Sequence, residues 1–115
     1  MARGEIWTVD IPVPAGKPRH EQLGIRPGIV VQADKAVSQL PTTIVIPATS
    51  RQEARRFPYT VAIQPSLQNG LERPSVLLVF QIRAIDKRRL IRRLGRLEDD
   101  HLKNLENQIR DLLAI

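Results

Sequence analysis

The 115-residue sequence contains no cysteine, and this absence limits its chemistry first. Disulfide bonds are excluded, and so are zinc sites built from thiolates. Only two histidines are present, His20 and His101, which leaves a histidine-based metal site short of ligands. We therefore expect neither a metal nor any other cofactor.

Aromatic residues and long apolar runs are also scarce. The four aromatics are Trp7, Phe57, Tyr59 and Phe80, too few for a binding mode built on many stacked rings. The longest apolar run, Val76 to Phe80, is too short to cross a bilayer. Residues 1–10 carry two carboxylates, which a secretory signal would not. We expect a cytoplasmic protein made of one domain over residues 1–115.

Positive charge is what the chain has in excess. Eighteen lysines and arginines oppose twelve acidic residues, for a formal charge of +6. The densest group is Arg83, Lys87, Arg88, Arg89, Arg92, Arg93 and Arg96, opposed only by Asp86. A smaller group holds Arg51, Arg55 and Arg56 beside Glu53. Such a distribution favours a polyanionic partner such as nucleic acid, the alternative being a soluble protein that is simply basic.

The apolar pattern predicts a mainly β fold with one helix at its end. Strands are expected at residues 5–10, 28–32, 42–47, 59–64, 75–82 and 92–97, with a helical turn at 86–90. The helix is indicated by five apolar residues on one face: Leu102, Leu105, Ile109, Leu112 and Leu113. This order predicts an α+β fold, a small curved antiparallel sheet or half-open barrel with the helix packed against it.

Residues 11–24 form a predicted loop with three prolines and two glycines. A loop of this length in so small a domain is often functional. It contains His20, whose ordinary pKa suits a proton carrier or a phosphate contact. An exposed histidine without a role is the alternative.

Polar residues follow or precede several predicted strands. Arg26 stands before residues 28–32, and Thr49-Ser50 follows residues 42–47. Gln81, Arg83 and Asp86 close residues 75–82. If these strands are neighbours, the polar groups converge at the rim of the sheet. Ordinary capping and turn formation is the competing interpretation, especially for Thr49 and Ser50. No G-x-S-x-G elbow and no glycine-rich phosphate loop is present.

An ordered series of short motifs resembles the MazF/PemK toxin family. It runs from residue 3 to about residue 97 and comprises Arg3-Gly4-Glu5-Ile6-Trp7, His20-Glu21-Gln22, Gly24-Ile25-Arg26-Pro27, Pro47-Ala48-Thr49-Ser50, Asn69-Gly70-Leu71, Ser75-Val76, Gln81-Ile82-Arg83 and Ile85-Asp86-Lys87. The resemblance implies the plasmid-maintenance toxin fold, related to SH3-like barrels. It also implies a homodimer with an RNA groove near its interface and a cognate antitoxin whose C-terminal segment covers that groove.

The same resemblance implies a sequence-specific endoribonuclease that cuts single-stranded RNA without a metal. Attack by the 2′-OH would leave a 2′,3′-cyclic phosphate and a 5′-OH. Arg26 and Thr49 match the residues usually assigned as catalytic in MazF enzymes, and Glu21 matches a loop acid. His20, Arg83 and Asp86 match the set used in the Kid branch. This sequence holds both sets. We expect further RNA contacts from Arg19, Gln32, Ser50, Arg51 and Gln81.

Some positions depart from the family pattern. Phe80 stands where many members have an acidic or polar residue, and Ala84 replaces a common threonine. The RNA recognition sequence is therefore not carried over. Two other functions stay open: a CcdB-like toxin that binds gyrase without cleaving nucleic acid, and a basic SH3-like module that binds RNA without catalysis.

Overall fold

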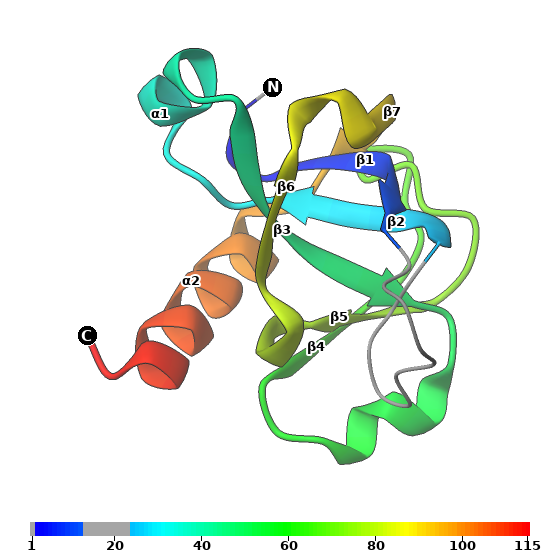
Figure 1. Ribbon diagram of the computed structural model, residues 1–115. Coiled ribbons are helices and arrows are strands. Elements are labelled where there is room, and N and C mark those ends of the chain that lie inside the picture. The colour runs from blue at the N-terminus through cyan, green and yellow to red at the C-terminus, as the bar shows by residue number, and fades with distance from the viewer. Residues whose placement is uncertain (1, 13–23) are drawn as a thin grey trace.

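The computed structural model describes residues 2–12 and 24–115 (Figure 1). Its strands are β1 (Glu5–Ile11), β2 (Gly24–Val30), β3 (Thr42–Thr49), β4 (Thr60–Ile63), β5 (Ser75–Leu78), β6 (Arg83–Asp86) and β7 (Leu90–Arg96). Its α-helices are α1 (Asp34–Gln39) and α2 (Asp99–Leu113). Three short 3₁₀ helices complete the described part: η1 (Gln52–Arg56), η2 (Val79–Gln81) and η3 (Lys87–Arg89).

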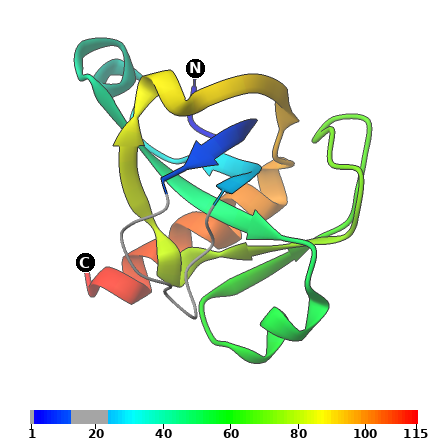
Figure 2. The ribbon, with the colours of Figure 1, turned by 45° about the vertical axis from the view of Figure 1, so that its right-hand side comes forward.

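The strands form one antiparallel sheet in the order β4-β5-β3-β2-β1-β7, and β6 pairs with β3 outside this path. The sheet bends strongly but does not close, since β4 and β7 remain its two ends (Figures 1 and 2). The prediction of a curved antiparallel sheet with a C-terminal helix is thus confirmed.

β3 is the central strand because it is shared by three partners. β2 pairs with one edge, and β5 and β6 divide the other. Leu77 of β5 faces Ala48, and six residues later Arg83 of β6 faces Val45, only three residues back along β3. The turn η2 takes up the three extra residues. The single strand predicted at residues 75–82 is therefore wrong; the chain forms two strands separated by a turn.

Both faces of the central strands are buried, because side chains alternate between the two faces of a strand. Ile29 and Ile46 belong to a core cluster that also contains Leu105 of α2. Their sequence neighbours Val30 and Val45 belong to a second cluster on the opposite face. This burial on two sides explains why the predicted central strands read as continuous β-branched runs.

The C-terminal helix was predicted correctly in place and, for the most part, in its apolar face. Leu105 is fully buried, and Leu102, Ile109 and Leu112 pack against the same cluster. Leu113 is the exception, since it is 52% exposed. Asp99 and Asp100 occupy the first turn, where the helix dipole favours negative charge.

Candidate active site

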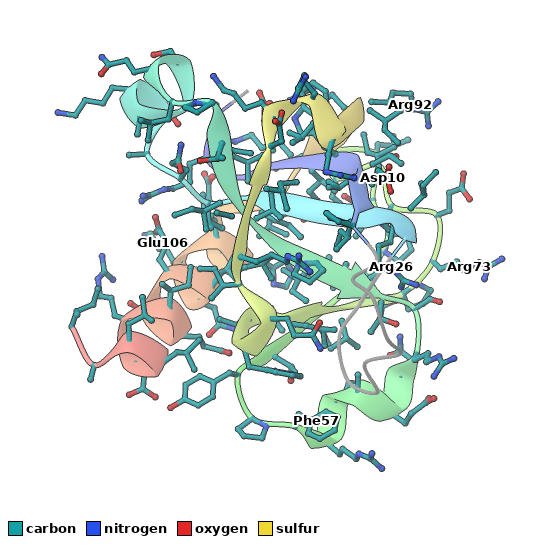
Figure 3. All side chains as sticks on the ribbon, in the orientation of Figure 1. Asp10, Arg26, Phe57, Arg73, Arg92 and Glu106 are labelled. Atoms are coloured by element: carbon teal, nitrogen blue, oxygen red, sulfur yellow. The ribbon has the colours of Figure 1, made fainter. Side chains whose placement is uncertain are left out.

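A pocket of about 360 Å³ opens at the C-terminal end of β3. Five strands, β1, β2, β3, β5 and β7, and the segment between β4 and β5 supply its described walls. Its polar lining residues are Thr8, Arg26, Thr49, Ser50, Glu72, Arg73, Ser75 and Arg92. Figure 3 shows Arg26 beside the tip of β3, with Arg73 on the outer side.

The sheet register explains why a hollow forms there. Arg92 of β7 faces Thr8 of β1, and Thr8 faces Pro27 of β2. Ala48 of β3 lines the same pocket. Thr8, Pro27 and Ala48 have short side chains, so this part of the curved sheet leaves space above it.

Arg26 and Thr49 both line this pocket, although they are 23 positions apart in the chain. The ladder between β2 and β3 ends at the pair of Gly28 with Pro47. Arg26 and Thr49 each lie two residues beyond that pair, on strands that are neighbours in the sheet. This explains why both reach the same pocket.

The guanidinium of Arg26 is partly withdrawn from solvent. Burial lowers its pKa from the ordinary arginine value, and the nearby positive charge of Arg51 lowers it further. An arginine nevertheless keeps its charge in a protein. Arg26 thus supplies a partly desolvated cation in a pocket that also contains hydrogen-bond donors.

The side chain of Thr49 is oriented by the turn that follows β3. Its Oγ1 accepts a hydrogen bond from the Arg51 backbone N–H at 3.2 Å. A hydroxyl has two lone pairs and one proton, so this bond leaves the Thr49 proton available for donation. Thr49 is only 4% exposed, yet it lines the pocket.

The residues that follow Thr49 are hydrogen-bonded to the segment before β5. Gln52 Nε2 donates to the carbonyl oxygens of Ser50, at 3.3 Å, and of Pro74, at 3.0 Å. Ser75 Oγ donates to the Arg73 carbonyl oxygen at 2.9 Å. Gln52 therefore connects the residue after β3 to the segment before β5, and Ser75 fixes the local conformation of that segment.

A family comparison identifies what kind of protein carries this pocket. Residues 2–113 match the model of the PemK-like, MazF-like toxins of type II toxin–antitoxin systems. The chain belongs to this family. The family predicted from the sequence motifs is confirmed.

Individual relatives of this toxin-family member agree. The Endoribonuclease MazF of Staphylococcus saprophyticus is 37% identical over 95% of this chain and 88% of its own length. The Endoribonuclease EndoA of Bacillus subtilis is 34% identical over 100% of this chain and 96% of its own. The crystal structure of MazF from Deinococcus radiodurans has a TM-score of 0.80, covering 100% of this chain and 97% of that one. At 23% identity, this last match shows the fold alone.

Two of the predicted catalytic residues lie elsewhere in this toxin-family chain. Arg83 and Asp86 belong to β6, where Arg83 faces Val45 and Asp86 faces Thr42 of β3. Neither lines the pocket of Arg26 and Thr49. His20 and Glu21, like Arg19, lie outside the described residues.

The carboxylate of Asp86 is hydrogen-bonded to Arg88, two residues further along the chain. Its Oδ1 accepts bonds from the Arg88 backbone N–H, at 2.9 Å, and from Nε, at 3.1 Å, while Oδ2 accepts from Nη2 at 2.9 Å. The side-chain and then the backbone hydrogen bonds from Arg88 lower the Asp86 pKa to about 2.

The predicted RNA contacts divide in the same way. Ser50 lines the pocket, and Arg51 acts on Arg26 through its charge. Gln32 is buried, and its Nε2 donates to the Thr42 carbonyl oxygen at 3.2 Å, where it holds the chain between β2 and β3. Gln81 lies in η2, away from the pocket lining.

Sequence reasoning missed Glu72 and Arg73 and gave Arg92 no place in the site. All three line the pocket. The sequence marked Asn69-Gly70 only as a turn and Arg92 only as one member of a basic run. The pairing that brings them together depends on contacts between distant segments.

Two features are absent from the part of the chain that the structure describes. Within residues 2–12 and 24–115, no three histidine, aspartate or glutamate side chains gather as metal ligands would. Neither of the α-helices described there has the length and apolar character needed to span a membrane.

Proposed function

We propose that this family member is a sequence-specific endoribonuclease toxin that cuts single-stranded RNA by attack of the 2′-OH, without a metal. Its products are a 2′,3′-cyclic phosphate and a 5′-OH. The observation that carries the proposal is the placement of Arg26 and Thr49 on adjacent strands at one pocket. The names of the two relatives, both endoribonucleases, support the reaction class.

Arg26 stabilises the charge that develops on the phosphate. In-line attack puts extra negative charge on the non-bridging oxygens, and a planar guanidinium can donate to two of them. Its partial burial weakens competition from water, so the attraction is stronger than at an exposed position. Such electrostatic stabilisation supplies several kcal/mol of barrier reduction, on the order of 3 to 4 for one well-placed donor.

Thr49 donates its hydroxyl proton to the scissile phosphate or to the 2′-OH. The Arg51 backbone N–H occupies one lone pair of Oγ1, which restricts the hydroxyl orientations and favours donation into the pocket. The role is one of positioning a reacting group and adding a second donor beside Arg26.

The proton transfers fall to His20 or Glu21 in this proposal. A carboxylate with a pKa of about 2, as Asp86 has, is a weak base near neutral pH. Its oxygens also already accept three bonds from Arg88. We therefore assign Asp86 the role of fixing the conformation of η3 through its bonds to Arg88. Arg83 is assigned a contact to a more distant phosphate.

The biological setting follows from the family. A toxin of a type II system has an antitoxin, and we propose that the cognate antitoxin inhibits this chain by covering the Arg26–Thr49 pocket. We further propose that the toxin is a homodimer acting on cytoplasmic RNA. Light scattering of the purified chain tests the dimer, and a mass near that of one 13.0 kDa chain would contradict it.

The reaction is tested with the purified chain and a random-sequence single-stranded RNA in EDTA. We expect cleavage at a few recurring motifs, with mass spectrometry identifying cyclic-phosphate ends. A matched oligonucleotide with one 2′-deoxy nucleotide at the cut site should resist cleavage, because the nucleophile is missing. Cleavage of that oligonucleotide would exclude 2′-OH attack, and binding without any cleavage would instead favour the RNA-binding module.

A further inference from the structure

The wall of the pocket opposite Arg26 is a rigid contact between two distant segments. Gly70, with φ +70°, lies so close to β7 that a Cβ there would overlap the Leu94 carbonyl oxygen. A Cβ on Gly95 would likewise overlap the Gln68 carbonyl oxygen. The Arg96 backbone N–H donates to that same oxygen at 2.9 Å. Only glycines permit this approach, which brings the segment after β4 against β7 (Figure 2).

Asn69 fixes the segment from inside. It is fully buried, and its Oδ1 accepts from the backbone N–H groups of Ser66 and Leu71, both at 3.0 Å. Its Nδ2 donates to the Gln64 carbonyl oxygen at 2.9 Å. Buried and satisfied polar groups of this kind hold a loop in one conformation. The next residues, Glu72 and Arg73, are therefore presented from a fixed base.

Two arginines project from this wall, and their charges are not neutralised by a neighbour. Arg73 follows the locked segment, and Arg92 stands on β7 opposite Thr8. Both are exposed. Within the described part of the chain, neither has a carboxylate within ion-pair distance, whereas Arg93 pairs with Glu5 at 3.4 Å.

The charge balance of the pocket is accordingly positive. Arg26, Arg73 and Arg92 line it, and Glu72 is the one carboxylate among the described lining residues. The volume of about 360 Å³ corresponds to about twelve waters at about 30 Å³ each, more than a single phosphate group fills. One strand, β1, separates β7 from β2, so the backbones of Arg92 and Pro27 lie roughly 10 Å apart.

We propose that Arg73 and Arg92 form a second phosphate subsite, which holds a phosphate next to the scissile one on the same RNA strand. The inference rests on the proposed function and adds to it the requirement for a substrate that continues beyond the cut. The glycine contacts and Asn69 fix the backbone from which Arg73 extends, so less backbone entropy is lost when a phosphate binds. The contacts of Arg73 and Arg92 with that phosphate place the scissile phosphate against Arg26.

The test neutralises one phosphate at a time. A cleavable single-stranded RNA is made in versions that carry a methylphosphonate at each phosphate flanking the cut, and kcat/KM is measured at low salt. For the unaltered protein, we expect one flanking position to lower kcat/KM about tenfold. Arg73→Ala and Arg92→Ala should each lower kcat/KM on the natural RNA by a similar factor and lose sensitivity at that same position.

Arg93→Ala is the matched control, because it removes the same charge from the adjacent position of β7, which faces Trp7 rather than Thr8. This variant should keep the full sensitivity. Binding of an uncleavable 2′-deoxy analogue gives a second readout. Each of the two pocket variants should reduce the slope of log Kd against log salt by about 0.7, the value for one lost contact to a single strand.

The outcomes separate the two proposals. If the unaltered protein cleaves RNA but Arg73→Ala and Arg92→Ala retain both the methylphosphonate sensitivity and the salt slope, the second subsite is wrong and the proposed reaction stands. If the unaltered protein does not cleave any RNA, the proposed function itself fails. Equal losses in Arg93→Ala would show a general charge effect and would also overturn the subsite.

Discussion

The two ends of β3 carry two different arrangements of charge. At the C-terminal end, Arg26 and Thr49 share a pocket where three guanidiniums meet one carboxylate among the described lining residues. Along the N-terminal half, Asp86 of β6 is bound by Arg88, so that anion and cation largely neutralise each other. The first arrangement leaves a net positive charge, which the proposed function assigns to a phosphate. In the second, the charges bind each other. Similar residue types thus serve different purposes, depending on which partners the fold supplies.

The largest effect is expected from removing the partly buried cation. Arg26→Ala should lower kcat for RNA cleavage about 10³-fold, as loss of a principal electrostatic stabiliser does. Arg26→Lys should recover only part of the rate, because an ammonium lacks the bidentate geometry. Single-turnover cleavage measures the effect, with circular dichroism as the control for folding. Near-normal cleavage by a folded Arg26→Ala variant would remove the C-terminal end of β3 from the mechanism.

A smaller loss is expected at Thr49, on the strand next to that of Arg26 in the same pocket. Thr49→Val keeps the shape of the side chain but removes the hydroxyl, and it should lower kcat between about tenfold and a hundredfold. Thr49→Ser should retain most activity, since it keeps both the donor and the acceptor for the Arg51 N–H. Comparison of the two variants separates the hydroxyl from packing. If serine and valine are equally damaging, the methyl group rather than the hydrogen bond is what matters.

Arg83→Ala tests how much the residues beside the N-terminal half of β3 contribute to cleavage. Arg83 faces Val45, four residues from Thr49, so it lies roughly 13 Å further along the strand. We expect kcat/KM to fall less than about tenfold, with a weaker salt dependence as the accompanying sign of a lost phosphate contact. A loss as large as that of Arg26→Ala would mean that the two ends of β3 act in one site, for example across a dimer.

The sequence alone predicted the strands and the helix that depend on a local pattern of residues. The β-branched runs at residues 28–32 and 42–47 indicated the two strands that carry Arg26 and Thr49, because burial on both faces produces such runs. Because those two strands are neighbours in the sheet, both residues reach one pocket. The helix α2 could be predicted equally well, because the spacing of its apolar residues does not depend on other segments.

What the sequence did not predict depends on tertiary contact. Residues 75–82 have a strand-like composition throughout. They are interrupted by η2 because β5 and β6 pair with different parts of β3. Arg73 and Arg92 are nineteen positions apart, and they line one pocket because Gly70 and Gly95 allow their segments to approach. A glycine in a sequence shows that a close contact is permitted, but not which segment makes it.

The smallest effect is expected at Asp86, and it concerns pH. Its pKa of about 2, below the ordinary 3.8, means that the folded state binds fewer protons than the unfolded state between about pH 4 and pH 2. The carboxylate therefore contributes stability above about pH 4, and this contribution disappears as the pH falls through 2. Asp86→Asn removes it, although the exposed position keeps the effect small. Thermal unfolding should show the variant less stable at pH 7 and the difference from the unaltered protein narrowing from pH 4 to pH 2.

The pH dependence of cleavage between pH 5 and 8 should stay unchanged in Asp86→Asn, because a group with this pKa does not titrate there. A shifted acid limb in Asp86→Asn would instead make Asp86 a participant in proton transfer and return the N-terminal half of β3 to the reaction.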